Sequence, residues 1–291
     1  SPTPQPPAVW RIAPETADVD LISQVDQVLA AQTGIEVSTF AQFTAPDSST
    51  NLKTVIFVDS AEDVAGIAAG QPDVQFIAIG ADLPPAGANL SVIDDQLAQR
   101  SFLLGYIATL VAPDFRSGAL FMENDPDLAL LEDTFLNGGR YLCGRCVPVY
   151  TPLVTFPETT TMPAGSDSAA LQAAFDTFNQ NRYQVLFVPA AAQQPDFLAY
   201  LANQNVVMLG LNTPPSDYLP YWVVTIQADI ATPLATLLSQ ALSGQGGQSA
   251  QASLALQDVN DAYLTSGKLL MVNETIQNIE GGWVTPQSVQ P

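Results

Sequence analysis

The side chains in this sequence that can take part in chemistry are mainly carboxylates and amides. The 291-residue chain carries 29 Asp and Glu, 8 Lys and Arg, and no histidine. Without histidine, Ser-His-Asp and Cys-His catalysis and histidine-based zinc sites are excluded. Two cysteines cannot build a structural zinc site alone. The remaining chemistry is hydrogen bonding by carboxylates and amides, stacking by aromatic rings, and acid–base work by paired carboxylates.

Polar candidates for a binding site follow the carboxyl ends of predicted strands, where ligands sit in open α/β sheets. Asn212 is our strongest candidate, although a turn residue before Pro214 is a competing interpretation. Asp82 either faces a ligand or caps its loop. The ligand-binding candidates of this kind are Glu15, Asp82, Glu123, Asn124, Asn212 and Gln227.

Aromatic rings near strand ends are candidates for stacking on a ligand. Phe40 and Phe43 follow the second predicted strand and Phe156 follows a later one; for each of them a place in the core is the competing interpretation. Trp222 stands in an aromatic cluster with Tyr218 and Tyr221.

Motifs for metals and nucleotide cofactors are missing from the sequence. The acidic pairs Asp18-Val19-Asp20 and Asp125-Pro126-Asp127 lack the order of a calcium loop, and no P-loop or G-x-G-x-x-G follows the first strand. We therefore expect neither a metal nor a cofactor. A carboxylate pair for glycoside hydrolysis stays open, because the separation of its members is spatial.

Cys143 and Cys146 form a C-x-x-C pair at the end of a predicted helix. At the start of a helix the dipole would stabilise a reactive thiolate, but at its end it does not. We expect a small structural disulfide that closes a turn. A catalytic dithiol and free buried thiols are the alternatives.

Composition limits the partners and the location. A formal charge of −21 disfavours nucleic acid and an anionic membrane surface. No apolar run approaches the roughly 20 residues that span a bilayer. Residues 1–7 are rich in proline and are expected to form a tether, as in an exported, lipid-anchored protein.

Short apolar runs alternate with amphipathic stretches, which is typical of a doubly wound α/β fold. Ser60 suits the N-cap of the predicted helix over 61–69, with Asp63 at the capping-box position. The predicted strands span 8–13, 35–40, 54–58, 74–80, 89–93, 117–122, 147–154, 183–188, 206–211 and 221–226. The predicted helices span 18–33, 61–69, 95–111 (with a strong apolar face), 127–141, 167–181, 195–203 and 230–242, and irregular strand pairs are expected over 253–283.

This pattern restarts near Pro113 and predicts two α/β lobes joined by a three-segment hinge, with a ligand trapped between them. The N-terminal lobe is expected to hold residues 8–113 and about 228–262. The C-terminal lobe is expected to hold residues 114–227 and about 263–291.

Three segments resemble the basic membrane protein family, the purine-nucleoside-receptor-like lipoproteins of ABC importers. They are Val-Gln-Phe-Ile-Ala-Ile-Gly-Ala-Asp at 74–82, Asn-Leu-Ser-Val at 89–92, and Arg-Ser-Phe-Leu-Leu-Gly-Tyr-Ile-Ala at 100–108. The resemblance implies a type 1 periplasmic binding protein fold, an extracytoplasmic location, an ABC permease as partner, and a monomer that binds a nucleoside-like ligand without catalysis.

The sequence departs from that family at its ligand contacts. No aromatic residue follows the first strand at Pro14-Glu15, the family's ribose-binding aspartate falls on Asn212, and a family lysine falls on Gln227. A small neutral ligand is therefore the broader expectation. The other hypotheses are a ligand-sensing module for a membrane regulator and an extracellular hydrolase that uses acidic residues.

Overall fold

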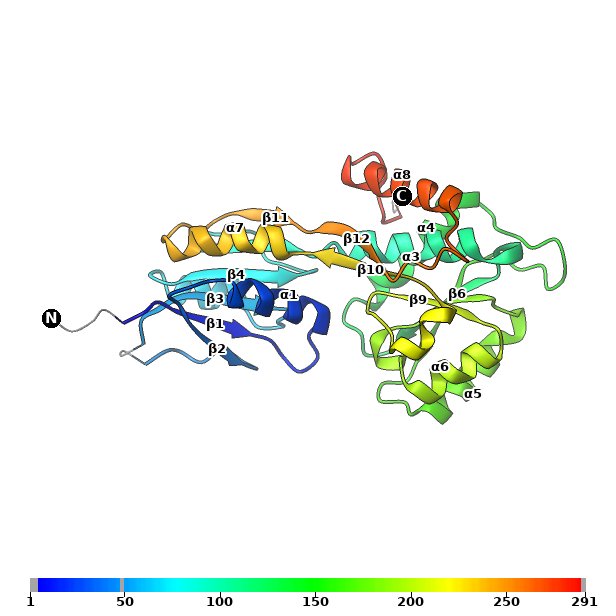
Figure 1. Ribbon diagram of the computed structural model, residues 1–291, viewed down its shortest axis with the longest axis horizontal. Coiled ribbons are helices and arrows are strands. Elements are labelled where there is room, and N and C mark those ends of the chain that lie inside the picture. Colours follow the sequence, from blue (N-terminus) through cyan, green and yellow to red (C-terminus); the bar gives the residue numbers. More distant parts are fainter. Residues whose placement is uncertain (1–4, 48–49, 289–291) are drawn as a thin grey trace. The chain divides into compact units, whose positions relative to one another are not determined.

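The computed structural model describes residues 5–47 and 50–288, which form two compact units (Figure 1). The first unit comprises the chain up to Leu97 together with Ala228–Ser253, and the second comprises Ala98–Gln227 together with the chain from Leu254 onward. The chain thus passes from one unit to the other three times. The first four residues of the expected tether lie outside the described residues, whereas the carbonyl groups of Gln5 and Pro6 accept hydrogen bonds from Asn51.

The first unit is built on a six-stranded sheet in the order β11-β5-β4-β3-β1-β2, in which every pair of neighbours is parallel. Its central strands are almost entirely apolar because helices cover both faces. The strands are β1 (Ala8–Ile12), β2 (Glu36–Phe40), β3 (Leu52–Val58), β4 (Gln75–Gly80), β5 (Leu90–Asp94) and β11 (Ser249–Gln251).

The two faces of this sheet are covered differently. On one face, α1 (Val19–Ala30) and α7 (Ala231–Leu242) pack against Ile56, Ile77 and their neighbours. On the other face, α2 (Val64–Gly70) packs near an aromatic group that includes Phe43, Phe57 and Phe76. Asp63 caps α2, and Ser60 instead accepts a hydrogen bond from the backbone of Glu62, so the predicted Ser60 cap is wrong.

The second unit repeats the scheme, with a sheet in the order β12-β10-β9-β8-β6-β7. The pairs from β10 through β7 are parallel. Its strands are β6 (Ser117–Met122), β7 (Glu158–Met162), β8 (Val185–Phe187), β9 (Val207–Gly210), β10 (Trp222–Asp229) and β12 (Ser253–Gln257). Its helices are α3 (Leu97–Val111), α4 (Leu128–Cys143), α5 (Ser168–Phe178), α6 (Pro195–Asn203) and α8 (Ser266–Glu280), with short 3₁₀ turns at 113–115, 179–181, 190–192 and 216–221. The predicted architecture of two doubly wound α/β lobes is confirmed.

Three local predictions are wrong. Residues 147–154 form a loop rather than a strand, and the edge position beside β6 belongs to β7. The tail contains the helix α8, whose Val272, Ile276 and Ile279 are buried at helical spacing. The helix α3 is buried around most of its circumference, not along one apolar face, and it lies in the second unit from Ala98 onward. Among the described residues, no helix is both long and apolar enough to cross a membrane.

The helices α3 and α4 approach each other through glycine. A Cβ at Gly105 of α3 would overlap the carbonyl oxygen of Phe135, and a Cβ at Gly138 of α4 would overlap that of Phe102. The next residue, Gly139, leaves room for Pro157 and Thr109. Glycine inside a helix costs about 1 kcal/mol relative to alanine. Here the missing side chains allow the two helix backbones to touch.

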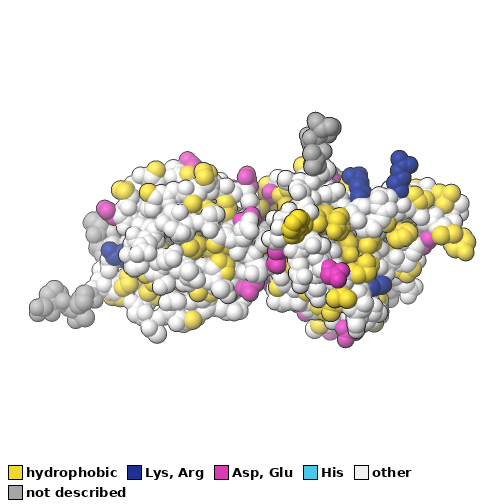
Figure 2. All heavy atoms as spheres, turned by 90° about the horizontal axis from the view of Figure 1, so that it is seen from above, with side chains coloured by type: hydrophobic (Ala, Val, Ile, Leu, Met, Phe, Trp, Pro, Cys, Tyr) yellow, Lys and Arg dark blue, Asp and Glu magenta, His cyan; other side chains and the backbone are white. Residues whose placement is uncertain are grey.

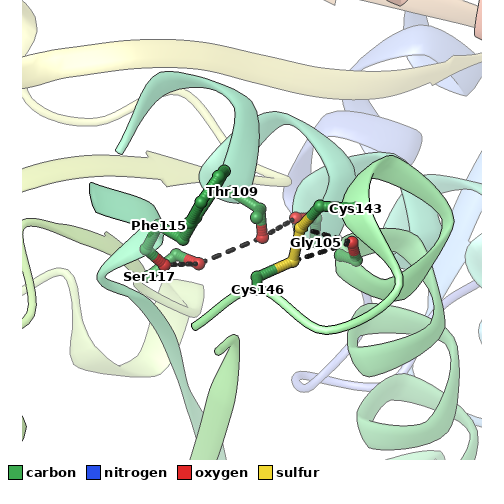
Figure 3. The surroundings of a disulfide bond; sticks show 7 residues. Gly105, Thr109, Phe115, Ser117, Cys143 and Cys146 are labelled. Carbon is green, nitrogen blue, oxygen red and sulfur yellow. Dashed lines mark hydrogen bonds between the residues drawn. A yellow bond between two sulfur atoms is a disulfide. The ribbon is translucent and has the colours of Figure 1, made fainter. Parts of the chain in front are cut away.

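The C-terminal end of α4 carries the disulfide. Cys143 and Cys146 are joined, with their Cα atoms 5.5 Å apart, as predicted from the C-x-x-C pair (Figure 3). Next to it, the hydroxyl of Thr109 donates to the carbonyl of Gly105 at 2.8 Å and lies 3.0 Å from the hydroxyl of Ser117. These hydrogen bonds join α3 to the start of β6.

Replacing Gly138 by alanine is expected to destabilise the second unit by about 1–3 kcal/mol, because the added methyl group overlaps backbone that cannot move aside. Gly267, at the start of α8, has open space around its Cα and is the matched control. Gly267→Ala should be neutral or stabilising by up to about 1 kcal/mol. Calorimetric unfolding of both variants tests this, and equal transitions would contradict the packing argument.

The disulfide closes a short loop, so the chain-entropy model gives it about 2 kcal/mol of stabilisation. A Cys143→Ser/Cys146→Ser variant should therefore lose no more than about 2 kcal/mol and remain folded. In the unchanged protein, iodoacetamide should label no cysteine under denaturing conditions until a reductant is added. Labelling without reductant would mean free thiols.

Candidate functional site

The candidate site in the second unit is the carboxyl edge of its sheet. The strand register pairs Thr225 with Gly210, so Gln227 and Asn212, each two residues further on, reach the same level of the sheet. When the strand register is followed from β9 to β8 and then to β6, Glu123 lies within about one residue of the same level. Three strand spacings of about 4.8 Å separate β10 from β6, roughly 14 Å in all, which suits a ligand of a few rings.

The loops at this edge are held together by amide side chains. Nε2 of Gln193, in the loop after β8, donates to the carbonyls of Val188 at 3.3 Å and Asn212 at 3.4 Å. Gln194 donates to the carbonyl of Ser166 at 2.8 Å and accepts from the hydroxyl of Ser168 at 2.7 Å. The loops after β7, β8 and β9 are thus bonded into one edge.

Asp258 anchors the other side of the edge. Its Oδ2 accepts hydrogen bonds from the hydroxyls of Thr225 at 2.8 Å and Thr213 at 2.9 Å. The hydroxyl of Thr225 also accepts a hydrogen bond from the indole N–H of the fully buried Trp222 at 3.0 Å. The Thr225 hydroxyl has one proton, which it donates to Asp258, so it can only accept from Trp222. We call this chain from Trp222 through Thr225 to Asp258 the relay.

The polar residues predicted in this unit all lie at this edge. Glu123 and Asn124 are exposed immediately after β6. Asn212 is half-buried, and Gln227, which is 9% exposed, is the last residue of the unit's first segment. The structure therefore brings four of the six polar candidates to one end of one sheet.

Two of the four aromatic candidates are core residues. Phe156 is fully buried edge-to-face against Tyr183, with 5.7 Å between ring centroids. Trp222 is fully buried in the cluster around β6, β8 and α6. Their ring faces are covered by protein, so in this structure neither is available to stack on a ligand, and the core interpretation of Phe156 is the better one.

The carboxyl edge of the first unit holds the other candidates. Glu15 and Asp82 are exposed there. Phe40 is exposed at the end of β2 and packs on Trp10 with 4.9 Å between centroids, whereas Phe43 is half-buried among Trp10, Phe57 and Phe76. Of the predicted aromatic residues, Phe40 alone is exposed at this edge.

Asp59, which directly follows β3, shapes the first unit's edge. It has a positive φ of 45°, and its carboxylate accepts the backbone N–H of Asp18 at 2.9 Å. A Cβ at Gly80, whose φ is +155°, would come within 3.2 Å of the same carboxylate. The loops after β1, β3 and β4 are therefore fitted to one another around Asp59.

Both edges are negative or neutral. The segments that follow the strands, at 13–18, 41–47, 59–63, 81–89, 123–127, 163–167, 188–194 and 211–221, contain Asp, Glu, Asn and Gln but no Lys or Arg. A phosphorylated or otherwise anionic ligand would meet repulsion without a compensating cation. Among the residues in the described ranges, no group of three or more Cys, Asp or Glu side chains is arranged to hold a metal ion.

Two surface pockets of the second unit lie away from this edge. One, of about 470 Å³, is at the amino ends of β6 and β8 and is lined by Asp114, Arg116, Val149, Tyr150, Thr151, Arg182 and Gln184. The other, of about 320 Å³, is lined by Phe102, Asn137, Arg140, Tyr141, Trp283, Val284 and Thr285.

Sequence reasoning missed Gln193, Thr225 and Asp258. Asp258 follows β12, in a tail whose strand order the apolar pattern does not give. Gln193 follows three alanines and belongs to no recognisable sequence motif. A polar residue just after a short apolar run was the available signal for Asp258, and nothing in the sequence marked it as the acceptor of two threonine hydroxyls.

No protein-family model matches this chain, and no curated protein matches it at a significant level. Solved structures do. An ABC transporter system solute-binding protein from Aeropyrum pernix superposes with a TM-score of 0.70 at 14% identity, over 99% of this chain and 94% of the other. One from Conexibacter woesei gives 0.68 at 15% identity, over 96% and 97%.

Proteins described as regulators share the fold as well. A transcriptional activator of the comK gene from Bacillus halodurans superposes with a TM-score of 0.65 at 9% identity, over 97% of this chain and 99% of the other. At these identities the likeness shows the fold alone. The chain has the two-lobe α/β fold of ABC transporter solute-binding proteins, and nothing in these likenesses supports the narrower resemblance to the basic membrane protein family.

Thr225→Val should destabilise the second unit by about 1–3 kcal/mol, because it leaves the buried indole N–H of Trp222 without an acceptor. Thr177, exposed on α5 with its hydroxyl bonded to the carbonyl of Ala173, is the control. Thr177→Val should change the free energy of unfolding by less than about 0.5 kcal/mol. Urea unfolding followed by tryptophan fluorescence measures both. An unchanged free energy of unfolding for Thr225→Val would show that the hydrogen bonds of Thr225 do not stabilise this unit.

Proposed function

We propose that this chain is the solute-binding protein of an ABC importer and that it binds a small neutral ligand without catalysis. The observation that carries the proposal is the carboxyl edge of the second unit's sheet, where Asn212, Gln227 and Glu123 reach one level and no Lys or Arg is present. The fold likeness to solute-binding proteins supports it.

The ligand is best matched by a polar heterocycle, with a nucleoside as the first compound to test. Amide side chains such as Asn212 and Gln227 both donate and accept, which suits hydroxyl groups and ring nitrogens. In the first unit, taken by itself, Phe40 with its partly open ring offers a stacking surface, and Asp82 and Glu15 are exposed acceptors for hydroxyl groups.

We place the protein outside the cytoplasm, held at the membrane by a lipid, where it works as a monomer with an ABC permease. The disulfide Cys143–Cys146 supports an oxidising location. The fold likeness supports the permease as partner.

A second candidate function is ligand sensing, because proteins described as transcription regulators share the fold. The same binding residues serve either role. Disruption of the gene separates them: loss of uptake of the labelled ligand indicates transport, and a lost transcriptional response with normal uptake indicates sensing. The hydrolase hypothesis has no observation that favours it over binding.

A panel of nucleosides, sugars and amino acids should contain a compound that raises the melting temperature by several degrees at saturating concentration. For that compound, Asn212→Ala and Gln227→Ala should each weaken the affinity about five- to tenfold, the worth of one hydrogen bond to a ligand. Asn273→Ala, an exposed amide on α8, is the control and should leave the affinity unchanged.

The measurement is calorimetric titration of the purified chain. A panel in which nucleosides give no response but another neutral solute does would retain the proposed role and change the ligand. Preferential binding of phosphorylated compounds, or equal affinities for the Asn212 and Asn273 variants, would contradict the proposed site.

A further inference from the structure

The loop between α4 and β7, residues 147–155, presents apolar side chains to solvent. Val149 is 78% exposed, Tyr150 is 75% exposed and Leu153 is 62% exposed. In Figure 1 this green segment projects from the helices of the second unit. Large apolar side chains exposed together on one short loop mark a surface that is covered in use. We call residues 147–155 the apolar loop.

The backbone of the apolar loop is held from inside, which leaves its side chains to point outward. The guanidinium of Arg116, a residue that is only 6% exposed, donates to the carbonyl of Tyr150 at 2.8 Å and, more weakly, to that of Thr151 at 3.3 Å. Asp114 accepts the backbone N–H of Val149 at 2.7 Å. The loop backbone is therefore fixed by hydrogen bonds to the side chains of Arg116 and Asp114.

The base of the loop is closed covalently and by packing. Cys146 forms an antiparallel bridge with Phe156 and a disulfide with Cys143. Arg116 lies 5.8 Å from the ring centroid of Phe156, which is itself fully buried. The result is a short hairpin-like projection that hydrogen bonds hold at Val149, Tyr150 and Thr151 and whose tip is apolar.

The charge around the apolar loop is opposite to that of the chain. Residues 134–157 contain Arg140 and Arg145 and no Asp or Glu, in a protein of net charge −21. Both arginines are exposed, and Arg182 lines the pocket beside Val149 and Tyr150. Figure 2 shows dark-blue, yellow and magenta side chains on the surface of the second unit.

Two acidic residues that adjoin the loop, Asp114 and Glu158, already have partners. Asp114 lies 3.5 Å from the Nε of Arg116. Glu158 accepts hydrogen bonds from the amide of Asn181 at 2.7 Å and the hydroxyl of Tyr183 at 2.5 Å. Exposed cations near the loop therefore include Arg145, at its base, and Arg182, which lines the pocket beside Val149 and Tyr150.

We propose that the apolar loop is a membrane-docking element that inserts Val149, Tyr150 and Leu153 into the interface of a bilayer containing anionic phospholipid. Aliphatic and tyrosine side chains at a tip, with exposed arginines near its base, match the interfacial region, where apolar groups meet acyl chains and cations meet phosphates. At physiological ionic strength the Debye length is about 8 Å, so the local arginines govern contact and distant carboxylates are screened.

A second copy of this chain fits the loop less well. The described pockets that could receive projecting side chains each hold one unbalanced cation: one is lined by Asp114, Arg116 and Arg182, and the other by Arg140. Inserting the loop there would bring Arg145 toward like charges, which opposes association. Self-association is therefore an outcome that the test must distinguish.

The test is co-sedimentation of the purified full chain with vesicles of phosphatidylcholine, with and without phosphatidylglycerol, in buffer of physiological ionic strength. The unchanged protein should bind the anionic vesicles and bind the neutral ones several-fold less. Val149→Ser/Leu153→Ser should reduce the partition coefficient at least tenfold, because the inserted apolar side chains are lost. Arg145→Gln should reduce it about fivefold.

Leu270→Ser is the matched control, since Leu270 is 61% exposed on α8 of the same unit and should leave vesicle binding unchanged. Melting temperatures should be unchanged in all variants, because the altered side chains are exposed. Absence of binding to anionic vesicles, or equal binding by the loop and control variants, would overturn the proposal. So would a concentration-dependent dimer, seen by light scattering, that Val149→Ser/Leu153→Ser abolishes.

Discussion

The close approach of α3 and α4 is the constraint on which the second unit depends. Gly105 and Gly138 let the two backbones touch, so α4 has one available position against α3. The N-terminal end of α4 follows the loop that carries Glu123 and Asn124, and its C-terminal end carries Cys143. One helix contact thus sets the geometry of the candidate ligand edge and of the base of the apolar loop.

The two ends of the second unit's sheet have opposite chemistry. At the carboxyl ends of the strands, amides and carboxylates are bonded into a rim by Gln193 and Asp258. At the amino ends, Arg116 holds the apolar loop. Parallel strands produce this separation, because every strand directs its carboxyl end to the same edge. The proposed binding of a solute at the carboxyl end and of a membrane surface at the amino end requires these two ends to differ in chemistry.

Most of the fold could be predicted from local patterns, and the failures have local causes too. Apolar runs such as Thr54–Val58 become buried parallel strands because helices cover both faces of the sheet. Residues 147–154 are also rich in apolar side chains, but Pro148 and Pro152 cannot donate hydrogen bonds to a sheet, and β6 already has β7 and β8 as neighbours. The spacing of Val272, Ile276 and Ile279 is typical of one buried helix face, so α8 could have been predicted from the sequence.

The sequence by itself determined the chemistry that is open to this protein: no histidine, few cations, and amides after strand ends, which together point to binding of a neutral solute. Only the tertiary structure decided which of those residues meet. It buried Trp222 and Phe156, made Asp258 the acceptor for Thr225, and turned Val149, Tyr150 and Leu153 outward among arginines in an acidic chain. The physical reason is that periodicity reports which residues one element buries, whereas burial and pairing between elements depend on strand order and helix contacts that no local pattern encodes.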